Sequence, residues 1–300
     1  MKRTPSSVLV AAVRQLRPKQ WSKNVVFLMP ALVFSGEFLD PRALMRVGVG
    51  IVAFSLLASA GYVLNDWLDR EADRKHPTKR HRPIASGALP EPFAWLLLLG
   101  CAATGGAIAL WLSPLFLLIA AIYLITTLSY SVHFKHVVIL DVLFLSSGFL
   151  WRVLAGAVAI NVDVSPWLFL CTVFVALFFG FNKRRAELLH VGAHSGTRRN
   201  LQEYSPQMLE QFQAIVTSAT IITYLLYTVL GPTRWMTLTI PFVLYGIFRY
   251  IYLIDRHGEG GAPDETLLRD RPMLLTGVLY GLTTVFVLLA RDWLSAILPP

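Results

Sequence analysis

Four polar residues in the segment NDWLDREADR have the types and the spacing of a metal site. Asn65, Asp69 and Asp73 follow one another at intervals of four residues, and Asp66 precedes Asp73 by seven. Residues at these intervals share one face of a helix, where carboxylates repel one another unless a cation lies among them. A few hard oxygen ligands at the end of an apolar segment are typical of Mg²⁺ shared with a substrate's phosphates. The segment predicts a site for a phosphate or diphosphate ester, and the alternative is a solvated helix end in which the acids pair with neighbouring arginines.

A cluster of basic residues follows the acids within a few positions. Lys79, Arg80 and Arg82 are bracketed by Pro77 and Pro83. Ammonium and guanidinium groups bind phosphate oxygens strongly, and the planar guanidinium can do so with two parallel hydrogen bonds. Because acids on one side and cations on the other suit a ligand rich in phosphate, this cluster favours the ligand site over the solvated helix end.

Two charged residues lie inside one apolar stretch. Asp141 and Arg152 both fall between residues 138 and 160, where a charged side chain is costly unless it faces a polar cavity. Tyr130 and Lys135 flank the turn before this stretch. We therefore expect Asp141 and Arg152 to face a cavity.

A third group of cations ends a later apolar stretch, in the segment FFGFNKRRAELLH. Lys183, Arg184 and Arg185 follow Asn182 there. These cations either fix the orientation of the chain in the membrane or form a second anion-binding surface. Both interpretations stay open.

The elements that must position these residues are apolar helices. The chain has 300 residues, of which 55% are hydrophobic and only 15% are charged, and its mean hydropathy is +0.57. This composition predicts an all-α polytopic membrane protein with a single transmembrane domain over residues 1–300. Nine apolar stretches are long enough, or nearly long enough, to cross about 30 Å of hydrocarbon. They are residues 24 to 38, 44 to 64, 93 to 112, 114 to 132, 138 to 160, 166 to 182, 211 to 230, 235 to 254 and 273 to 290.

Positive charge is distributed unequally between the two sides of these stretches. If nine helices alternate from a cytoplasmic N-terminus, 22 of the 27 lysines and arginines lie on the cytoplasmic side. This bias supports that orientation and explains most of the net charge of +9, so no nucleic-acid partner is needed. We expect residues 1–23 to form a cytoplasmic amphipathic helix on the membrane surface. Function is expected on the cytoplasmic loops at about residues 65–92, 183–210 and 255–272.

The run NDWLDREADRKHPTKRHRPIASG resembles the NDxxDxxxD signature, with its basic continuation, of the UbiA superfamily of intramembrane prenyltransferases. The resemblance implies a bundle of nine transmembrane helices around a lipid-accessible central cavity that opens to the cytoplasmic side. Within the superfamily the sequence is most similar to the phosphoribosyltransferase branch. The similar segments are LRPKQWSKN, YSVHFKHVVILDVLFLSSGFLWRVLAGAVA, GFNKRRAEL and LLRDRP, which together extend over most of the chain.

One departure from the superfamily pattern concerns the second acidic motif. Ordinary members carry aspartates between the sixth and seventh helices to bind a prenyl diphosphate, whereas this sequence has NKRRAE there. A basic motif is better suited to a phosphate group that cations bind directly.

The resemblance to the phosphoribosyltransferase branch implies transfer of the 5-phosphoribosyl group from 5-phosphoribosyl-1-diphosphate to a polyprenyl phosphate such as decaprenyl phosphate. Diphosphate is released, Mg²⁺ is the cofactor with Mn²⁺ as the alternative, and the product feeds cell-wall arabinan synthesis at the bacterial plasma membrane. Two other functions stay open. One is a prenyltransferase that joins a prenyl diphosphate to an aromatic acceptor, and the other is a transporter of lipids or small molecules. A homo-oligomer is also compatible with the sequence.

The resemblance also assigns roles residue by residue. Asn65, Asp66, Asp69 and Asp73 would hold Mg²⁺ on the donor's diphosphate, and the three aspartates would be the catalytic residues. The remaining candidates would bind phosphate or ribose groups of the two substrates. They are Lys19, Lys23, Asn65, Lys79, Arg80, Arg82, Tyr130, Lys135, Asp141, Arg152, Lys183 and Arg184.

Overall fold

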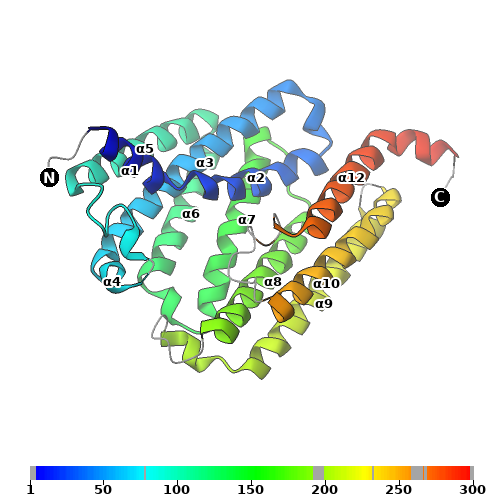
Figure 1. Cartoon of the computed structure of the whole chain (residues 1–300). Helices are drawn as coiled ribbons and strands as arrows, with labels where there is room; N and C mark the ends of the chain where they lie inside the picture. Colours follow the sequence, from blue (N-terminus) through cyan, green and yellow to red (C-terminus); the bar gives the residue numbers. More distant parts are fainter. Residues whose placement is uncertain are drawn as a thin grey trace. The chain divides into compact units, whose positions relative to one another are not determined.

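The computed structural model describes residues 5–77, 79–191, 199–231, 233–257, 266 and 269–297, and within these ranges it contains helices and no strand (Figure 1). The chain divides into two compact units, each with its own core. Unit 1 comprises residues 1–132 and 151–163, and unit 2 comprises residues 133–150 and 164–300. The all-α prediction is confirmed.

Eight helices of the described chain are long and apolar enough to cross a membrane, so the protein is a multi-pass integral membrane protein. Each corresponds to one of the stretches expected from the sequence. The eight are Pro41–Leu68, Glu91–Leu112, Pro114–Val132, Leu140–Ile160, Pro166–Leu189, Pro206–Leu230, Arg234–Arg256 and Arg271–Arg291.

The expected first span, residues 24 to 38, is not among these eight. The helix found there, α2, is Ser22–Phe34 and contains Pro30. Its 13 residues are about 20 Å long, which is less than the roughly 30 Å of a hydrocarbon core. The prediction of nine spans is therefore confirmed for eight stretches and not for this one, and the predicted central cavity stays a prediction.

Unit 1 is built around α3, Pro41–Leu68, which packs against α1, α2, α5 and α6. Its core contains Phe54, Phe116 and Tyr123, with the two phenylalanine rings edge to face at 5.7 Å. The other helices of this unit are α1 (Pro5–Leu16), α2, α4 (Arg70–Lys75), α5 (Glu91–Leu112), α6 (Pro114–Val132) and the second half of α7 (Leu140–Ile160).

The N-terminal helix α1 has one buried and one exposed side, and it packs against α3 and α5 within unit 1. Ala11 is buried in a small core with Val63 of α3 and Ala94 of α5, whereas Leu9 and Val13 are exposed. The sequence placed this helix on the membrane surface alone. The structure adds a docked face, which the short buried side chain of Ala11 allows because it lets two helices approach closely.

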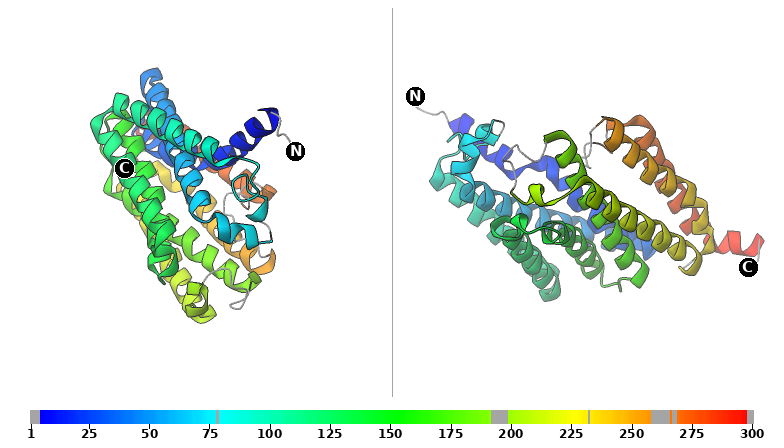
Figure 2. Two further views of the ribbon diagram at one scale, coloured as in Figure 1. Left: turned by 90° about the vertical axis from the view of Figure 1, so that its left-hand side faces the viewer. Right: turned by 90° about the horizontal axis from the view of Figure 1, so that it is seen from below.

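Unit 2 contains α8 (Pro166–Val191) and α9 (Pro206–Leu230), which pack along each other (Figure 1 and Figure 2). Tyr250 and Ile254 are buried in its core with Phe178. The other helices of this unit are the first half of α7, α10 (Ile240–His257) and α12 (Arg271–Ile297).

Two of the expected cytoplasmic loops begin as helix. Helix α8 continues to Val191, through the first part of the expected loop 183–210. Helices α3 and α4 occupy the start of the expected loop 65–92. The reason is that NKRRAELL consists mainly of good helix formers, so the helix continues beyond the apolar stretch. Much of the expected loop 255–272 lies outside the described residues.

Candidate functional site

The acidic motif lies where α3 passes into α4, in unit 1. Helix α3 ends at Leu68, and the backbone N–H groups of Asp69 and Asp73 donate to the carbonyl oxygens four residues earlier, at 2.9 and 2.8 Å. The path therefore stays close to helical, and it carries Asp66 and Asp73 to the same side. Both accept hydrogen bonds from one nitrogen, Arg82 Nη1, at 2.9 Å to Asp66 Oδ1 and 2.7 Å to Asp73 Oδ2.

The N-terminal segment supplies the other partners of Asp66. Gln15 Nε2 donates to Asp66 Oδ2 at 2.8 Å, and Arg17 Nη2 donates to Oδ1 and Oδ2 at 2.7 and 2.6 Å. Figure 2 shows the dark-blue helix α1 beside the cyan segment that carries α4 and Arg82. Asp66 is 1% exposed and Asp73 is 3% exposed, whereas the side chains of Arg17 and Arg82 are each 28% exposed. The cluster is thus a pair of buried acids under a partly open layer of guanidinium groups.

Arg17 holds an unusual backbone conformation at the end of α1. Its φ of 54° and ψ of 58° lie in the left-handed region, which costs a non-glycine residue about 1–2 kcal/mol. Two contacts retain it: the Arg17 guanidinium binds Asp66, and Ser59 Oγ donates to the carbonyl oxygen of Leu16 at 2.8 Å. Strain that persists in this way marks positions whose surroundings fix them.

The arginines nearest to the acids in sequence have other partners. Arg74 donates to the carbonyl oxygen of Ala85 and to Glu71, and Arg70 donates to the carbonyl oxygen of Trp67. The alternative of a solvated helix end does not describe Asp66 and Asp73, because both acids are buried and they bind Arg82 and, for Asp66, Arg17, instead of the neighbouring Arg70 and Arg74.

The remaining residues of the motif border this cluster in sequence. Asn65 and Asp69 are half-buried. Lys79 is half-buried and Arg80 is exposed, both on the short helix η3, Lys79–His81, which leads directly to Arg82. The predicted basic group thus follows the acids closely, with Arg82 as the member that contacts them.

Within the described ranges, no three or more His, Cys, Asp or Glu side chains are grouped so that they could hold a metal ion. The donor chemistry nevertheless fits a divalent cation, because carboxylate oxygens of Asp66 and Asp73 converge on one point that Arg82 Nη1 occupies. The fit differs between the two acids. Both oxygens of Asp66 are already engaged by protein donors, whereas Arg82 is the one donor to Asp73 Oδ2 among the residues that the structure describes.

A second acidic and basic cluster lies in unit 2, where α7 meets α8. Arg184 donates from Nε to Asp141 Oδ2 at 2.5 Å and from Nη1 to Glu187 Oε2 at 2.6 Å. Tyr204 Oη donates to Asp141 Oδ1 at 2.7 Å and accepts from the backbone N–H of Ile139, also at 2.7 Å. Arg184 is 1% exposed and Asp141 is 0% exposed.

This second cluster is closed, and burial raises the pKa of Tyr204 above its usual value, with the hydrogen bond to Asp141 acting in the same direction. The hydroxyl therefore stays protonated as a donor. The structure brings Asp141 and Arg184 together as partners of each other, and it shields both from solvent. Its geometry is that of a structural ion pair.

Arg152, the other charged residue of α7, belongs to unit 1. It donates from Nε to Asn24 Oδ1 at 2.6 Å and from Nη2 to Tyr123 Oη at 2.9 Å, and Asn24 donates to Ser55 Oγ at 3.0 Å. Arg152 is buried within this polar network. Asp141 and Arg152 therefore join different networks, although one helix carries both.

The other predicted residues differ in exposure. Lys19 is exposed, and Lys23, Tyr130, Lys135 and Lys183 are half-buried. Among the residues that the sequence did not single out as site residues, Gln15, Arg17, Asn24 and Tyr123 are direct partners of predicted residues in unit 1. No spacing rule finds them, because Gln15 and Arg17 are 51 and 49 residues from Asp66.

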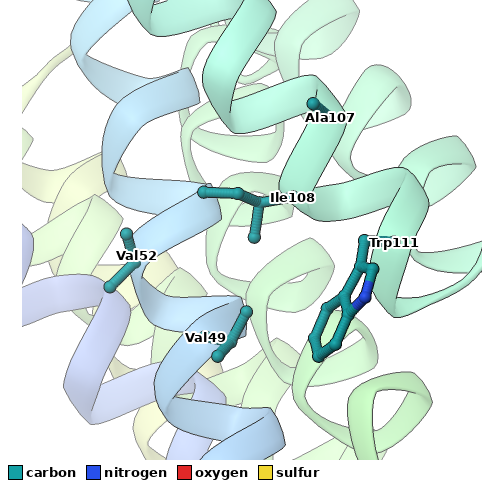
Figure 3. A pocket seen from close by; sticks show the side chains of 5 residues that line it. All are labelled: Val49, Val52, Ala107, Ile108 and Trp111. Carbon is teal, nitrogen blue, oxygen red and sulfur yellow. The ribbon is translucent and has the colours of Figure 1, made fainter.

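A groove between α3 and α5 is unsuited to phosphate binding. It has a volume of about 410 Å³ and is lined by apolar residues on the outside of unit 1, as Figure 3 shows. They are Val49, Val52, Ala107, Ile108 and Trp111. Nothing in this lining is charged, so the chemistry falls to the acidic motif.

The chain is similar to known proteins over most of its length. Residues 24–264 match the UbiA prenyltransferase family. The chain is 35% identical over 283 residues to the decaprenyl-phosphate phosphoribosyltransferase of Corynebacterium glutamicum, covering 89% of this chain and 83% of that one. It is 35% identical over 280 residues to the enzyme of the same name from Mycobacterium tuberculosis, covering 90% and 92%.

Solved structures show the same fold. A UbiA homolog from Archaeoglobus fulgidus bound to GPP and Mg²⁺ has a TM-score of 0.71 with 19% identity, over 93% of this chain and 99% of that one. The same homolog bound to DMAPP and Mg²⁺ has a TM-score of 0.71 with 20% identity, over 92% and 99%.

Proposed function

The chain belongs to the UbiA prenyltransferase family, and on that premise we propose that it transfers the 5-phosphoribosyl group of 5-phosphoribosyl-1-diphosphate to a polyprenyl phosphate, such as decaprenyl phosphate. One observation carries the choice of donor and acceptor. The described site has a single acidic motif, at Asp66 and Asp73, and the equivalent later position carries Lys183 and Arg184 instead. One diphosphate is then bound at the acids, and the second substrate is a monophosphate.

In the proposed reaction, the bond between the anomeric carbon of the ribose and the diphosphate oxygen breaks, and the electron pair leaves with diphosphate. A phosphate oxygen of the lipid forms the new bond to the anomeric carbon. Because a phosphate monoester is already ionised near neutral pH, it needs positioning more than it needs a general base. We accordingly assign no base.

The protein's part is to bind and neutralise the leaving diphosphate. Magnesium, with manganese as the alternative, supplies positive charge to the diphosphate when bound, and Asn65, Asp69 and Asp73 would hold it. Arg82 is suited to the donor's phosphate oxygens because its partly exposed guanidinium already lies at the acids.

The other candidates divide by their place in the sequence. Lys79 and Arg80 lead directly to Arg82, and they would bind phosphate groups of the donor together with the N-terminal Lys19 and Lys23. Tyr130, Lys135 and Lys183 come from later segments of the chain and would bind the lipid phosphate. We propose structural roles for Asp141, Arg152 and Arg184, because each is buried and bound to other protein groups.

The proposed reaction also explains where the protein would act and what its product would serve. A lipid acceptor keeps its isoprenoid tail in the bilayer while its phosphate meets a water-soluble donor, which explains why the catalyst is a membrane protein. The excess of lysine and arginine on one side supports a bacterial plasma-membrane protein with its N-terminus and acidic motif on the cytoplasmic side. The product would serve as a precursor of cell-wall arabinan.

The test offers two labelled donors to membranes that contain the protein. With 5-phosphoribosyl-1-diphosphate, label enters the lipid extract only when both polyprenyl phosphate and a divalent cation are present, and a chelator abolishes the transfer. Product from a prenyl diphosphate and an aromatic acceptor, with none from the phosphoribosyl donor, would establish a prenyltransferase instead. Movement of label across sealed vesicles without covalent change would establish a transporter.

Variants link this reaction to the acidic motif. Asp69→Asn removes one of the proposed metal ligands and is expected to abolish most of the transfer. The matched control is Asp163→Asn, which makes the same chemical change at an exposed aspartate outside the helices. Equal loss in both variants would contradict the assignment.

A further inference from the structure

The end of α1 is built into the acidic motif, and this contact involves residues that none of the assignments above explains. Gln15 and Arg17 donate three hydrogen bonds to Asp66, and Arg82 donates a fourth. A carboxylate accepts about four hydrogen bonds. Asp66 is thus saturated by protein donors, while Asp73 is not.

The side chain of Gln15 makes a costly arrangement in order to contact Asp66. Gln15 is 0% exposed, and its Oε1 atom has no hydrogen-bond partner in the described part of the protein, while Nε2 binds Asp66. A buried unpaired amide oxygen is costly. The orientation of Gln15 is therefore set by Asp66 and not by the amide's own requirements.

The turn after α1 indicates the same constraint at Arg17. Its left-handed backbone aims the guanidinium at both oxygens of Asp66, and the ring of Tyr62 lies 4.9 Å from the guanidinium carbon. Both hydrogen bonds come from one guanidinium nitrogen, Nη2, which bridges the two oxygens of the carboxylate in a short charge-assisted contact. Two costly features, a strained backbone and an unpaired amide oxygen, thus serve one carboxylate.

We propose that Gln15 and Arg17 are positioning residues of the donor site, which hold Asp66 as an anchor for Arg82. Asp66 is then not a metal ligand. Because Arg82 bridges Asp66 and Asp73, binding of the cation at Asp73 leaves Arg82 held by Asp66 alone, with its exposed side free for the donor's phosphates. This inference rests on the proposed donor, 5-phosphoribosyl-1-diphosphate. The part that concerns metal binding by Asp66 and Asp73 can be tested without the donor.

The experiment uses the full-length protein in detergent or nanodiscs and measures two quantities. The first is Mn²⁺ affinity in the absence of substrates, from the electron paramagnetic resonance signal of free Mn²⁺. The second is KM for 5-phosphoribosyl-1-diphosphate, determined separately from kcat. Thermal unfolding is recorded for every variant so that only folded protein enters the comparison.

Asp66→Asn is expected to bind Mn²⁺ within about twofold of wild type, whereas Asp73→Asn binds it at least about tenfold more weakly. Arg17→Gln is expected to raise KM for the donor by about tenfold to a hundredfold, with a smaller change in kcat, because it loosens Arg82 rather than the reacting atoms. Arg17→Lys should recover part of this loss because it restores the positive charge beside Asp66 without the planar guanidinium. Arg14→Gln is the matched control, since Arg14 is exposed on α1 three residues before Arg17.

Each arm has an outcome that overturns the proposal. If Asp66→Asn weakens Mn²⁺ binding as much as Asp73→Asn, Asp66 is a metal ligand. If Arg17→Gln and Arg14→Gln have the same KM, the N-terminal segment does not position the donor site. If Arg17→Gln does not fold, Arg17→Lys decides, because unchanged KM in that variant also overturns the proposal. No transfer by wild type, with Mn²⁺ binding intact, would contradict the proposed function while the metal arm still decides the role of Asp66.

Discussion

The two clusters of acids and arginines in this protein use similar residues for different ends. In unit 1, Asp66 and Asp73 are buried, but the arginines that bind them are 28% exposed. In unit 2, both Asp141 and its arginine are buried to within 1%. An arginine that retains contact with solvent can turn to an incoming phosphate, whereas one that is fully enclosed can only hold the protein together.

The two clusters also differ in how the charged side chains are paired. Arg184 has two carboxylate partners, and the hydroxyl of Tyr204 completes the shell of Asp141. At the other cluster two carboxylates share one nitrogen of Arg82, which concentrates negative charge at a single point. That arrangement favours exchange of the guanidinium for a divalent cation, and it is why we assign the chemistry to unit 1.

Removing the arginine of the closed cluster should give the largest effect on stability. Arg184→Met leaves Asp141 and Glu187 without their cation, and an uncompensated buried charge costs about 3–5 kcal/mol. Thermal unfolding in detergent measures the loss. Arg185→Met is the control, because Arg185 binds the more exposed Asp255 and Glu210, and it should lose less. A stable Arg184→Met protein without activity would instead make this cluster catalytic.

Removing an acid of the cluster in unit 1, whose arginines are partly exposed, should lower activity. Asp73→Asn keeps an oxygen that can accept from Arg82 but loses the charge that a cation needs, so kcat should fall about 10²–10³-fold. Its unfolding temperature should stay close to that of wild type. Steady-state transfer assays check the first expectation, and Asp163→Asn, at an exposed acid, is the control. If Asp73→Asn lost stability without losing turnover, the distinction between the clusters would not hold.

Glycine-to-alanine substitutions near each cluster should show a further difference in how tightly the two clusters are packed. A Cβ at Gly180 would lie 2.6 Å from Val142 Cγ1 and 3.2 Å from Ser146 Oγ, so Gly180→Ala should push α8 away from α7 at a cost of about 1–3 kcal/mol. A Cβ at Gly61, before Asp66, would meet only Leu124 Cδ2 at 3.8 Å. Gly61→Ala should therefore leave the unfolding temperature unchanged or raise it. Equal destabilisation of both variants would show that the closed cluster is not the more tightly packed one.

The smallest effect is expected from the hydroxyl of Tyr204. Tyr204→Phe removes the donor to Asp141 and the acceptor for the Ile139 N–H, at a cost of about 1–2 kcal/mol. Because burial raises the folded-state pKa of Tyr204, the hydroxyl's contribution is present below the unfolded pKa of about 10 and is lost as the pH rises above it. The stability difference between wild type and Tyr204→Phe should thus be constant from about pH 7 to about pH 9 and narrow above about pH 10. Unfolding measured across this range tests it, and a difference that grows with pH would contradict the assignment.

Much of the membrane architecture could be predicted from the sequence, because a span requires only length and apolarity. Eight of the nine expected stretches are span-length helices, and the ninth is not confirmed because α2 has only 13 residues. The acidic motif was also visible, since the spacing of Asp66 and Asp73 is a helical repeat. For Asp141 and Arg184 the sequence could not distinguish a structural role from a ligand-binding role, because it does not show which charged side chains are buried.

The sequence by itself determined the helices, the membrane environment and the acidic and basic segments, because these depend on composition and on neighbours within two turns of a helix. Only the tertiary structure decided which charges meet. Arg17 reaches Asp66 across 49 residues and Tyr204 reaches Asp141 across 63. Such contacts depend on how helices pack and where turns bring the chain back, and burial then decides whether an arginine is available to a ligand or is a fixed part of the fold.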